Sequence, residues 1–425
     1  MPGQGTNQNA LALQLEKVRP EVPLLYQVDD TLLGLIEERS EGMETVSTRA
    51  YRIPLELLAG GSLRQFNPDG GALGRGSAIR TDFGVLSQVY FVFAIEYTEE
   101  VRIATDSKEK AVENYVSKQM ERAMQQFRTG IEAILQGDGS GTLDTVVSVA
   151  GNPVITVNNA NQFFDGQVVQ VFPNLTSATR GSFTILAADS IANTITIDPS
   201  STLPAGTAAG DLLIVDGASG VANSCLNGLQ NLQLQSSVGT YLGIQRSAYP
   251  GRLSTPDIAG NSTSITPQRL RVMLNTVRTA LGAETPESAK WIWYMNVDQE
   301  AAIENNGLVV SQVIQNQLKG DSSVDMLMKN APKTFGGRPI KVSIHALPGR
   351  IDGLALSHWG RTQIQPMDYY EVNGQTIFPI YGTDGGLQAS LITYLWVGQN
   401  IFNDNPRAGV YSDGNNIPSG YFPYP

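Results

Sequence analysis

The chain of 425 residues contains one cysteine, Cys225, and two histidines, His345 and His358. A single cysteine excludes an intrachain disulfide and a multi-cysteine zinc site, and the histidines are not spaced as a pair of metal ligands. We expect a small buried side chain at Cys225 and hydrogen-bonded structural histidines. No Walker-type phosphate loop, dinucleotide fingerprint or His-Glu-x-x-His motif is present. The sequence therefore predicts no enzymatic activity, no cofactor and no metal.

Charge is also scarce. Charged residues make up 16% of the chain, against about 25% in a typical protein, and the net charge is −11. Sequence-independent affinity for nucleic acid comes from Lys and Arg, so specific DNA or RNA binding is not expected. A wall that only encloses DNA is compatible with an acidic surface. The low charge indicates either a surface covered by other subunits or a β-rich, loop-rich protein.

Long apolar runs are missing as well. The N-terminal residues 1–14 contain no basic segment followed by an apolar one, and no stretch of about 18 apolar residues occurs anywhere. The sequence therefore predicts neither a signal peptide nor a membrane span, and a protein that is made and kept in a cytoplasm.

The first 100 residues are predicted to be extended. Residues 1–45 resemble an arm, extended or partly helical, that needs a neighbour to hold it. In residues 46–100, two strand-like runs, Thr45–Ile53 and Val85–Tyr97, flank a glycine-rich middle. This pattern predicts a large β-hairpin. Loops of this length are uncommon and are usually functional or disordered.

The middle of this hairpin is basic although the chain is acidic. Between residues 49 and 80 only two acidic residues, Glu56 and Asp69, accompany five arginines, which are Arg49, Arg52, Arg64, Arg75 and Arg80. Guanidinium groups pair well with carboxylates. We therefore predict that these arginines contact another subunit; the alternative is a solvated loop with ordinary charges.

The clearest helix is predicted over residues 106–136. Asp106 and Glu109 have the spacing of a capping box, and apolar residues from Val112 to Leu135 follow one stripe of the helical period. The glycine-rich segment Gly137–Gly141 should end the helix. A helix of this length is about 45 Å long.

Residues 142–217 change character. Short β-rich runs separated by Asn, Gly, Pro and Asp predict a small barrel or sandwich: Val146–Val149, Val154–Val157, Gln167–Val171, Ser182–Leu186, Thr194–Ile197 and Leu212–Val215. The segment contains six aspartates, one arginine and no lysine. We expect an independent inserted domain whose acidic face points into solvent.

The rest of the chain mixes helices and strands. Thr266 and Pro267 predict the start of a helix that Gly282 ends, and a short helix is expected near residues 298–304. Further strands are predicted at Lys290–Met295, Ile340–Ile344, Gly353–Leu356, Arg361–Gln365 and Leu391–Val397. Residues 400–425 are predicted to be irregular. The order of elements indicates an α+β fold.

Two glycine-rich motifs have weak functional interpretations. Gly71–Gly76 is similar to an anion-binding nest, but no helix follows it. Asp138, Ser140 and Thr142 are similar to the start of a calcium loop, but the twelfth position, Val149, is not the glutamate that such a loop requires. A helix stop is the better interpretation of the second motif.

Three segments in the second half of the chain have a distinctive pattern. Residues 291–303 read Trp-Ile-Trp-Tyr-Met-Asn followed by Val-Asp-Gln-Glu-Ala-Ala-Ile, an apolar strand before a short helix. Residues 335–343 contain Gly-Gly-Arg-Pro-Ile before a strand, and residues 353–361 follow as the next strand and turn. In these segments, and in the order of arm, long β-loop, long helix and mixed domain, the chain resembles the Hong Kong 97-type major capsid proteins of tailed bacteriophages, which have a Gly-x-Pro-Val strand at the second position.

The resemblance implies a division of the chain. Residues 1–45 correspond to the N-terminal arm, 46–100 to an extended loop that reaches over a neighbouring subunit, and 101–141 to a peripheral domain with a spine helix. Residues 142–217 correspond to an inserted β domain, 218–390 to an axial domain with peripheral-domain strands, and 391–425 to a C-terminal strand and an irregular tail. This division implies pentamers and hexamers that form an icosahedral shell around double-stranded DNA.

The resemblance also implies partners. Portal and scaffolding proteins are expected, a decoration protein is an open alternative, and membrane contact is not expected. Some relatives join subunits covalently through a lysine of the extended loop, but residues 46–100 contain no lysine, so no such bond is predicted. Three alternatives stay open: an encapsulin-like compartment for cargo enzymes, a β-rich adhesin or tail protein, and a carbohydrate-active enzyme.

Overall fold

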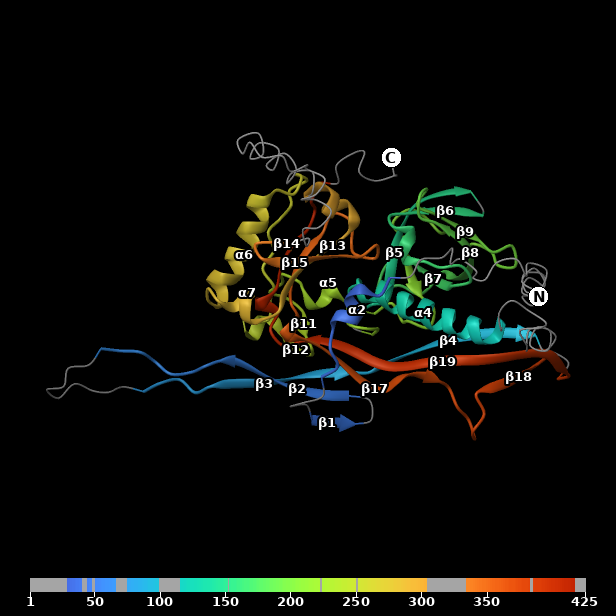
Figure 1. The fold of residues 1–425 in the computed structure, drawn as a ribbon, viewed down its shortest axis with the longest axis horizontal. Coiled ribbons are helices and arrows are strands. Elements are labelled where there is room, and N and C mark those ends of the chain that lie inside the picture. Colours follow the sequence, from blue (N-terminus) through green and yellow to red (C-terminus); the bar gives the residue numbers. More distant parts are fainter. Residues whose placement is uncertain are drawn as a thin grey trace, which may run out of the picture.

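The computed structural model describes ten ranges of the chain, which are 29–39, 44–47, 50–65, 75–98, 115–151, 153–221, 224–249, 251–303, 334–382 and 385–416. Within these ranges the fold is a mixture of many strands and few helices, as the sequence predicted. A long sheet forms the base of the molecule, two compact bodies lie side by side on one of its faces, and a β-hairpin projects beyond one end (Figure 1).

The long sheet is built around β19 (Leu387–Asn403). β4 (Val89–Thr98) pairs with one edge of β19, and β17 (Trp359–Tyr369) and β18 (Ile377–Tyr381) pair with the other edge. All of these pairs are antiparallel. The sheet therefore joins segments that lie almost 300 residues apart in the sequence.

Helix α4 (Tyr115–Leu135) covers one face of the long sheet, where the Phe93 and Phe127 rings lie 5.8 Å apart. Its buried stripe includes Ala123, Phe127 and Ile131, so the predicted periodicity is confirmed. The predicted first turns, with Asp106 and Glu109, lie outside the described residues. The helix ends before Gly137, and the Asp138 carboxylate accepts hydrogen bonds from the backbone and hydroxyl of Ser140. The motif at Asp138 therefore acts as a helix stop.

The hairpin pairs β2 (Ala50–Leu58) with β3 (Arg80–Ser87) in antiparallel register, which confirms the predicted hairpin. The prediction of one strand over Thr45–Ile53 is wrong, because β1 (Glu44–Ser47) folds back antiparallel on β2. The predicted run Val85–Tyr97 is likewise divided between β3 and β4. The buried Gln88 lies at the break, and its side chain donates to Thr362 Oγ1 over 2.7 Å.

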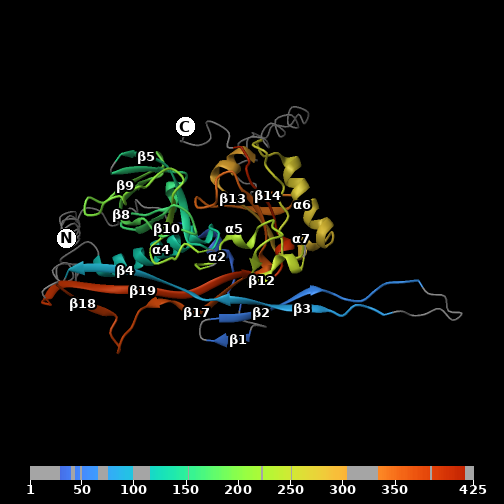
Figure 2. The ribbon, with the colours of Figure 1, turned by 180° about the vertical axis from the view of Figure 1, so that it is seen from behind.

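One of the two compact bodies is a closed barrel with the strand order β10-β5-β6-β9-β8-β7. Its strands are β5 (Thr142–Gly151), β6 (Val154–Val157), β7 (Val168–Phe172), β8 (Gly181–Asp189), β9 (Thr194–Ile197) and β10 (Leu212–Val215). Pairing of β10 with β7 closes the barrel, which Figure 2 shows from behind beside α4 and β4. Alternate β-branched residues such as Ile155, Ile195 and Ile197 fill its interior.

The acidic residues of the barrel do not all face solvent as predicted. Asp165, Asp189 and Asp216 are exposed, but Asp211 is buried and pairs with Arg180 at 2.9 Å. Asp144 is half-buried, where its carboxylate accepts hydrogen bonds from the backbone of Asn159 and other donors. Asp144 and Asp211 therefore bind groups within the barrel, and their charges do not face solvent.

The other compact body contains a five-stranded sheet in the order β14-β15-β13-β16-β20. Its strands are β14 (Thr334–Phe335), β15 (Arg338–Val342), β13 (Trp291–Met295), β16 (Ile351–Ala355) and β20 (Val410–Ser412). Smaller elements complete the body and its surroundings: α5 (Leu229–Leu232), β11 (Thr240–Tyr241), β12 (Ile244–Gln245) and α7 (Thr285–Ser288). Residues 297–303 are helical, as predicted.

Helix α6 (Pro267–Leu281) packs on this sheet. Thr266 Oγ1 accepts a hydrogen bond from the Arg269 backbone, and the helix ends at Gly282, as predicted. The prediction of an irregular segment from residue 400 is wrong over residues 400–403 and 410–412, because β19 continues to Asn403 and β20 joins the edge of the sheet at β16. The end of the described chain is thus part of the core, and residues 417–425 lie outside the described ranges.

Candidate assembly surfaces

The β2–β3 hairpin has one buried and one exposed face. Ile53, Leu55 and Leu86 are buried in the same apolar cluster as the β11–β12 hairpin. The Val85 backbone N–H also donates to the Leu242 carbonyl over 2.8 Å. A side chain at Gly84 would meet the Leu242 Cβ at 3.0 Å, so glycine allows the close approach. The base of the hairpin is therefore fixed to its own subunit.

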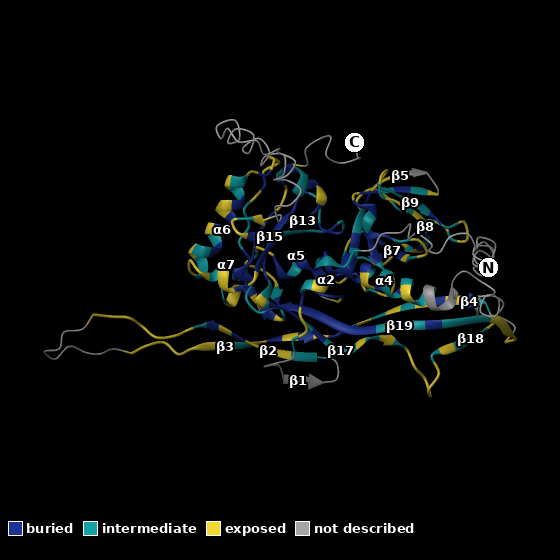
Figure 3. Cartoon of the chain, viewed as in Figure 1, coloured by how far each residue is buried: buried dark blue, intermediate teal, exposed yellow. Residues whose placement is uncertain are grey.

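The other face and the distal part of the hairpin have no cover among the described residues. Phe83 and Val85 are about half exposed, Ile79 is more exposed, and the Leu63 side chain is fully exposed. Figure 3 shows that exposed residues continue along the projecting part of both strands. An isolated two-stranded ribbon is at best marginally stable in water. The projecting part is therefore a candidate interface.

The predicted arginines are distributed along this hairpin. Arg52 lies in β2, Arg80 begins β3, and Arg64 and Arg75 lie in the distal part, where the Ser62 hydroxyl donates to the Arg75 carbonyl. All four are exposed and form no ion pair with the residues that the structure describes. Arg49 lies outside the described residues. The arginines do not form one compact patch, and contact with another subunit stays a prediction.

A second surface was not found from the sequence. The face of the long sheet opposite α4 carries linked aromatic rings, with Tyr90 stacked on Trp396 at 6.2 Å and Tyr370 edge-on to Trp396 at 5.5 Å. Val92 beside them is 64% exposed. Acidic side chains, Glu96 and Asp368, lie on the same face by register and are exposed. The alternating side chains of residues 89–97 indicate a strand with two different faces. They do not reveal the surface, because the strand that pairs with them lies about 300 residues later in the chain.

A buried carboxylate ties the start of the described chain to the core. Glu132 of α4 accepts hydrogen bonds from the backbone N–H groups of Leu32 and Leu33, which begin α2 (Thr31–Leu35). The Tyr294 hydroxyl and the Gln136 amide also donate to it. Burial raises the pKa of Glu132 to about 7, although its donors act in the opposite direction. One side chain thus joins α2, α4 and β13.

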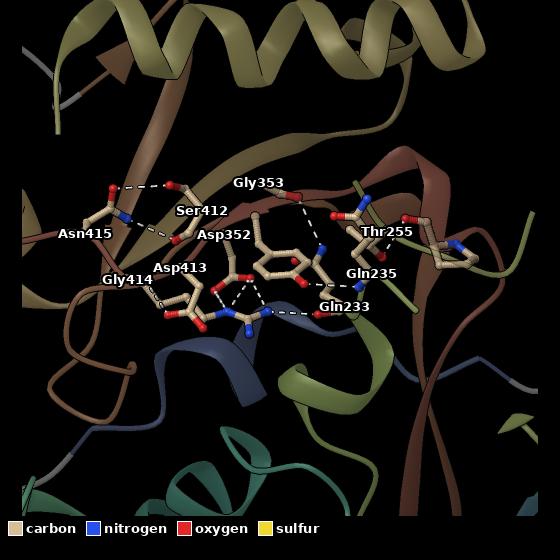
Figure 4. Close-up of polar contacts among 12 residues, drawn as sticks. Gln233, Gln235, Thr255, Asp352, Gly353, Ser412, Asp413, Gly414 and Asn415 are labelled. Atoms are coloured by element: carbon tan, nitrogen blue, oxygen red, sulfur yellow. Dashed lines mark hydrogen bonds and ion pairs between the residues drawn. The ribbon is translucent and has the colours of Figure 1, made fainter. Parts of the chain in front are cut away.

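A buried ion pair holds the five-stranded sheet to the segment after α5. The Arg350 guanidinium binds both oxygens of Asp352 at 2.9–3.1 Å and donates to the Gln233 carbonyl. It also lies 4.3 Å from the centre of the Tyr411 ring. Figure 4 shows how the Gln233 amide extends this network to the Gly353 carbonyl. Both charges are almost fully buried, so the network is structural.

The remaining candidate residues do not assemble a reactive site. Cys225 is buried as predicted, and burial raises its pKa to about 11. His358 is hydrogen-bonded to Asp404 at 2.6 Å, as predicted. His345 is buried beside the Asn161 backbone. In the described part of the chain no cluster of three potential metal ligands occurs. No described helix is long and apolar enough to cross a membrane. Residues 71–74 of the possible anion nest lie outside the described ranges.

Comparison with known proteins finds structures but no sequences. No family profile and no curated protein matches the chain. The capsid asymmetric unit of cyanophage A-1(L) superimposes with a TM-score of 0.55 at 13% identity, covering 96% of this chain and 98% of that chain. The capsid of the native GTA particle has a TM-score of 0.49 at 8% identity and covers 93% of each chain.

The holo-SrpI encapsulin complex from Synechococcus elongatus PCC 7942 has a TM-score of 0.46 at 10% identity, covering 96% of this chain and 95% of that chain. The fold assignment does not depend on the two structures below 0.5. It depends on the cyanophage capsid, whose similarity extends over almost the entire length of both chains. This chain therefore has the Hong Kong 97-type capsid fold that its sequence motifs indicated.

Proposed function

We propose that this protein is the major capsid protein of a tailed bacteriophage, which assembles into pentamers and hexamers of an icosahedral shell around double-stranded DNA. The observation that carries the proposal is the near-complete similarity in fold to a cyanophage capsid subunit. The proposed role is structural, with no catalytic step. A shell subunit also needs surfaces that stay uncovered in the single chain, and the hairpin and the aromatic sheet face are two such surfaces.

Within this proposal the parts of the chain have different roles. The β2–β3 hairpin is the extended loop that reaches a neighbouring subunit, α4 is the spine helix, and residues 142–217 are the inserted domain. The body with α6 and the five-stranded sheet is the axial domain, which meets its copies around the five-fold and six-fold axes. Closed rings of identical contacts produce a shell of finite size.

The contact between copies is supported by charge and shape. The hairpin offers Arg52, Arg64, Arg75 and Arg80 beside apolar side chains, and the outer face of the long sheet offers carboxylates beside aromatic rings. Arginine pairs with carboxylates and packs on aromatic faces. Scaffolding and portal proteins are further proposed partners, and the virion is the proposed location after assembly in the host cytoplasm.

Electron microscopy of the full chain, expressed alone and with the scaffolding protein from the same genome, tests the proposal. Closed round particles are expected. Particles that package double-stranded DNA when the portal and packaging proteins are present support a capsid. Particles that hold only a protein cargo favour the encapsulin-like alternative, and soluble monomers under every condition contradict a shell function.

A further inference from the structure

Strand β4 uses only one of its two edges for pairing within the described part of the chain. Its residues Val89–Thr98 pair continuously with β19, without a bulge. No other described strand pairs with β4, and no backbone hydrogen bond from another described segment reaches residues 89–97. In an antiparallel strand, every second residue directs both its N–H and its C=O to the same edge. About half of these residues therefore present backbone groups on an open edge.

This open edge carries none of the features that keep a strand edge from pairing with another chain. Natural edges are protected by lysine, proline, a bulge or a short strand. Residues 89–97 read Val-Tyr-Phe-Val-Phe-Ala-Ile-Glu-Tyr, so Glu96 is the single charge, and proline, glycine and lysine are absent. Tyr90 and Val92 on the outer face of the strand are also exposed. A long, apolar, unprotected edge is a site where another strand can add to the sheet.

The other strand edges among the described residues match β4 poorly. β1 has four residues, and β11, β12 and β14 have two each. β2 and β18 are interrupted by Pro54 and Pro379. The edges of β3, β17 and β20 are already bonded to neighbouring segments at Val85, Arg361 and Tyr411. The best-matched open edge is therefore that of β4 in a second copy.

Two copies of β4 can pair along the whole of residues 89–97 when they run antiparallel about Phe93. Val92 then lies opposite Ala94 of the second copy, and Tyr90 lies opposite Glu96. The two Glu96 side chains are about 20 Å apart along the strands, whereas a register centred on Glu96 would place like charges opposite each other. The pairing forms about eight to ten backbone hydrogen bonds, which is about the number in a typical protein interface.

This register gives both copies the same orientation. Residues that lie directly opposite each other in an antiparallel pair have their side chains on the same face of the sheet. Phe93 of both copies therefore faces the side of α4, where the ring lies 5.8 Å from Phe127 of its own chain. The two-fold axis is perpendicular to the sheet, so the compact bodies of both copies lie on one side of it. The wall of a shell requires this arrangement, because its inner and outer surfaces differ.

We propose that the open edge of β4 pairs antiparallel with β4 of a second copy about a two-fold axis at Phe93, so that one sheet continues across two subunits. This inference rests on the proposed function, because a shell provides the second copy in the required orientation. The contact uses the same surface on both copies and is therefore closed. It links subunits in pairs and leaves the aromatic sheet face free for the hairpin.

Disulfide trapping in the full chain tests the pairing. Val92→Cys with Ala94→Cys places two cysteines at positions that lie opposite each other in the pair, within disulfide reach of the second copy. The native Cys225 is buried and does not compete. The matched control, Val147→Cys with Val149→Cys, has the same spacing on exposed residues of β5, both of whose edges are paired inside the barrel.

After mild oxidation of assembled particles, most of the variant at residues 92 and 94 should migrate as a covalent dimer in a denaturing gel. Either single substitution and the control should stay monomeric, because their cysteines do not lie opposite each other. Particles without this dimer, or an equal yield of dimer from the control, overturn the pairing and leave the shell function intact. Dimers linked between residues 92 and 94 without any particles support the pairing and contradict the shell function.

Hydrogen exchange of the wild-type protein gives a second readout that does not depend on the folding of a variant. About half of the amides in peptides that cover residues 89–97 should exchange at least about 100-fold more slowly in particles than in the unassembled subunit. These are the amides on the open edge. Equal exchange rates in the two states overturn the proposal.

Discussion

Replacement of Phe83 by serine should weaken assembly without changing the subunit. The Phe83 side chain is 51% exposed on the outer face of β3. A phenylalanine side chain has about 200 Å² of surface, so covering the exposed half buries about 100 Å² and stabilises a contact by about 2.5 kcal/mol. Loss of this energy corresponds to about a 70-fold weaker contact. Since each subunit repeats the contact, the threshold concentration for shell formation should rise steeply.

The assay is light scattering during assembly, with electron microscopy of the products and circular dichroism of the unassembled subunit. The matched control is Leu186→Ser, which removes an equally exposed apolar side chain (48%) from the barrel. Phe83→Ser should raise the threshold and leave the circular dichroism spectrum unchanged, and Leu186→Ser should assemble normally. An unchanged threshold for Phe83→Ser, or an equal effect of both substitutions, refutes the assignment of the hairpin as the contact surface.

Three further results are expected. Asp352→Asn leaves the Arg350 charge buried without its partner and should lower the free energy of unfolding in urea by about 3–5 kcal/mol, whereas Arg350→Met with Asp352→Leu should recover most of it; a loss below about 1 kcal/mol for the single change argues against the buried pair. Reversing the exposed charges with Arg64→Glu and Arg75→Glu should slow assembly at low salt and reduce its salt dependence, and wild-type assembly rates for this variant would contradict a charged contact. Burial lowers the pKa of His345 in the folded protein to about 4 from an ordinary 6.5. The neutral side chain should therefore add about 3 kcal/mol to the free energy of unfolding above pH 6.5, and this amount is lost as the pH falls from 6.5 through 4. His345→Gln should remove this step from the pH dependence of unfolding, and an unchanged profile would show that another group titrates.

Local patterns predicted the local elements well. Thr266, Pro267 and Gly282 placed α6 at its observed ends, because caps act through the nearest backbone groups. The same holds for the barrel strands, whose alternation and turn residues are local. The division of one run into β1 and β2, and the break at Gln88, were missed, because nothing in a continuous β-rich run marks where its pairing partner changes.

Contacts between distant segments could not be predicted. The aromatic sheet face requires β4 beside β19, and the Glu132 network requires α2, α4 and β13 together. The segment after residue 400 appeared irregular because glycine, proline and asparagine are frequent there. Val410 and Tyr411 nevertheless lie in the edge strand β20 and are buried. Of the candidate site, the sequence identified the arginines but not the surface that they could meet.

The ends of the barrel explain how such a domain fits into the fold. Ile214 of β10 pairs with Thr142 of β5, and the Val215 backbone N–H donates to the Gly141 carbonyl over 3.0 Å. The chain therefore leaves the barrel beside the point where it enters. The positions of α4 and of the residues after 215 thus do not depend on the size of the segment between them. The barrel also closes its own strand edges, so none of its strands needs a pairing partner from the rest of the subunit. Its interior nevertheless continues into the apolar cluster that contains α4 and the long sheet. Adjacent ends and closed edges allow a domain to be inserted without changing the pairing of its host, and they support the proposal that residues 142–217 are an insertion in a capsid fold.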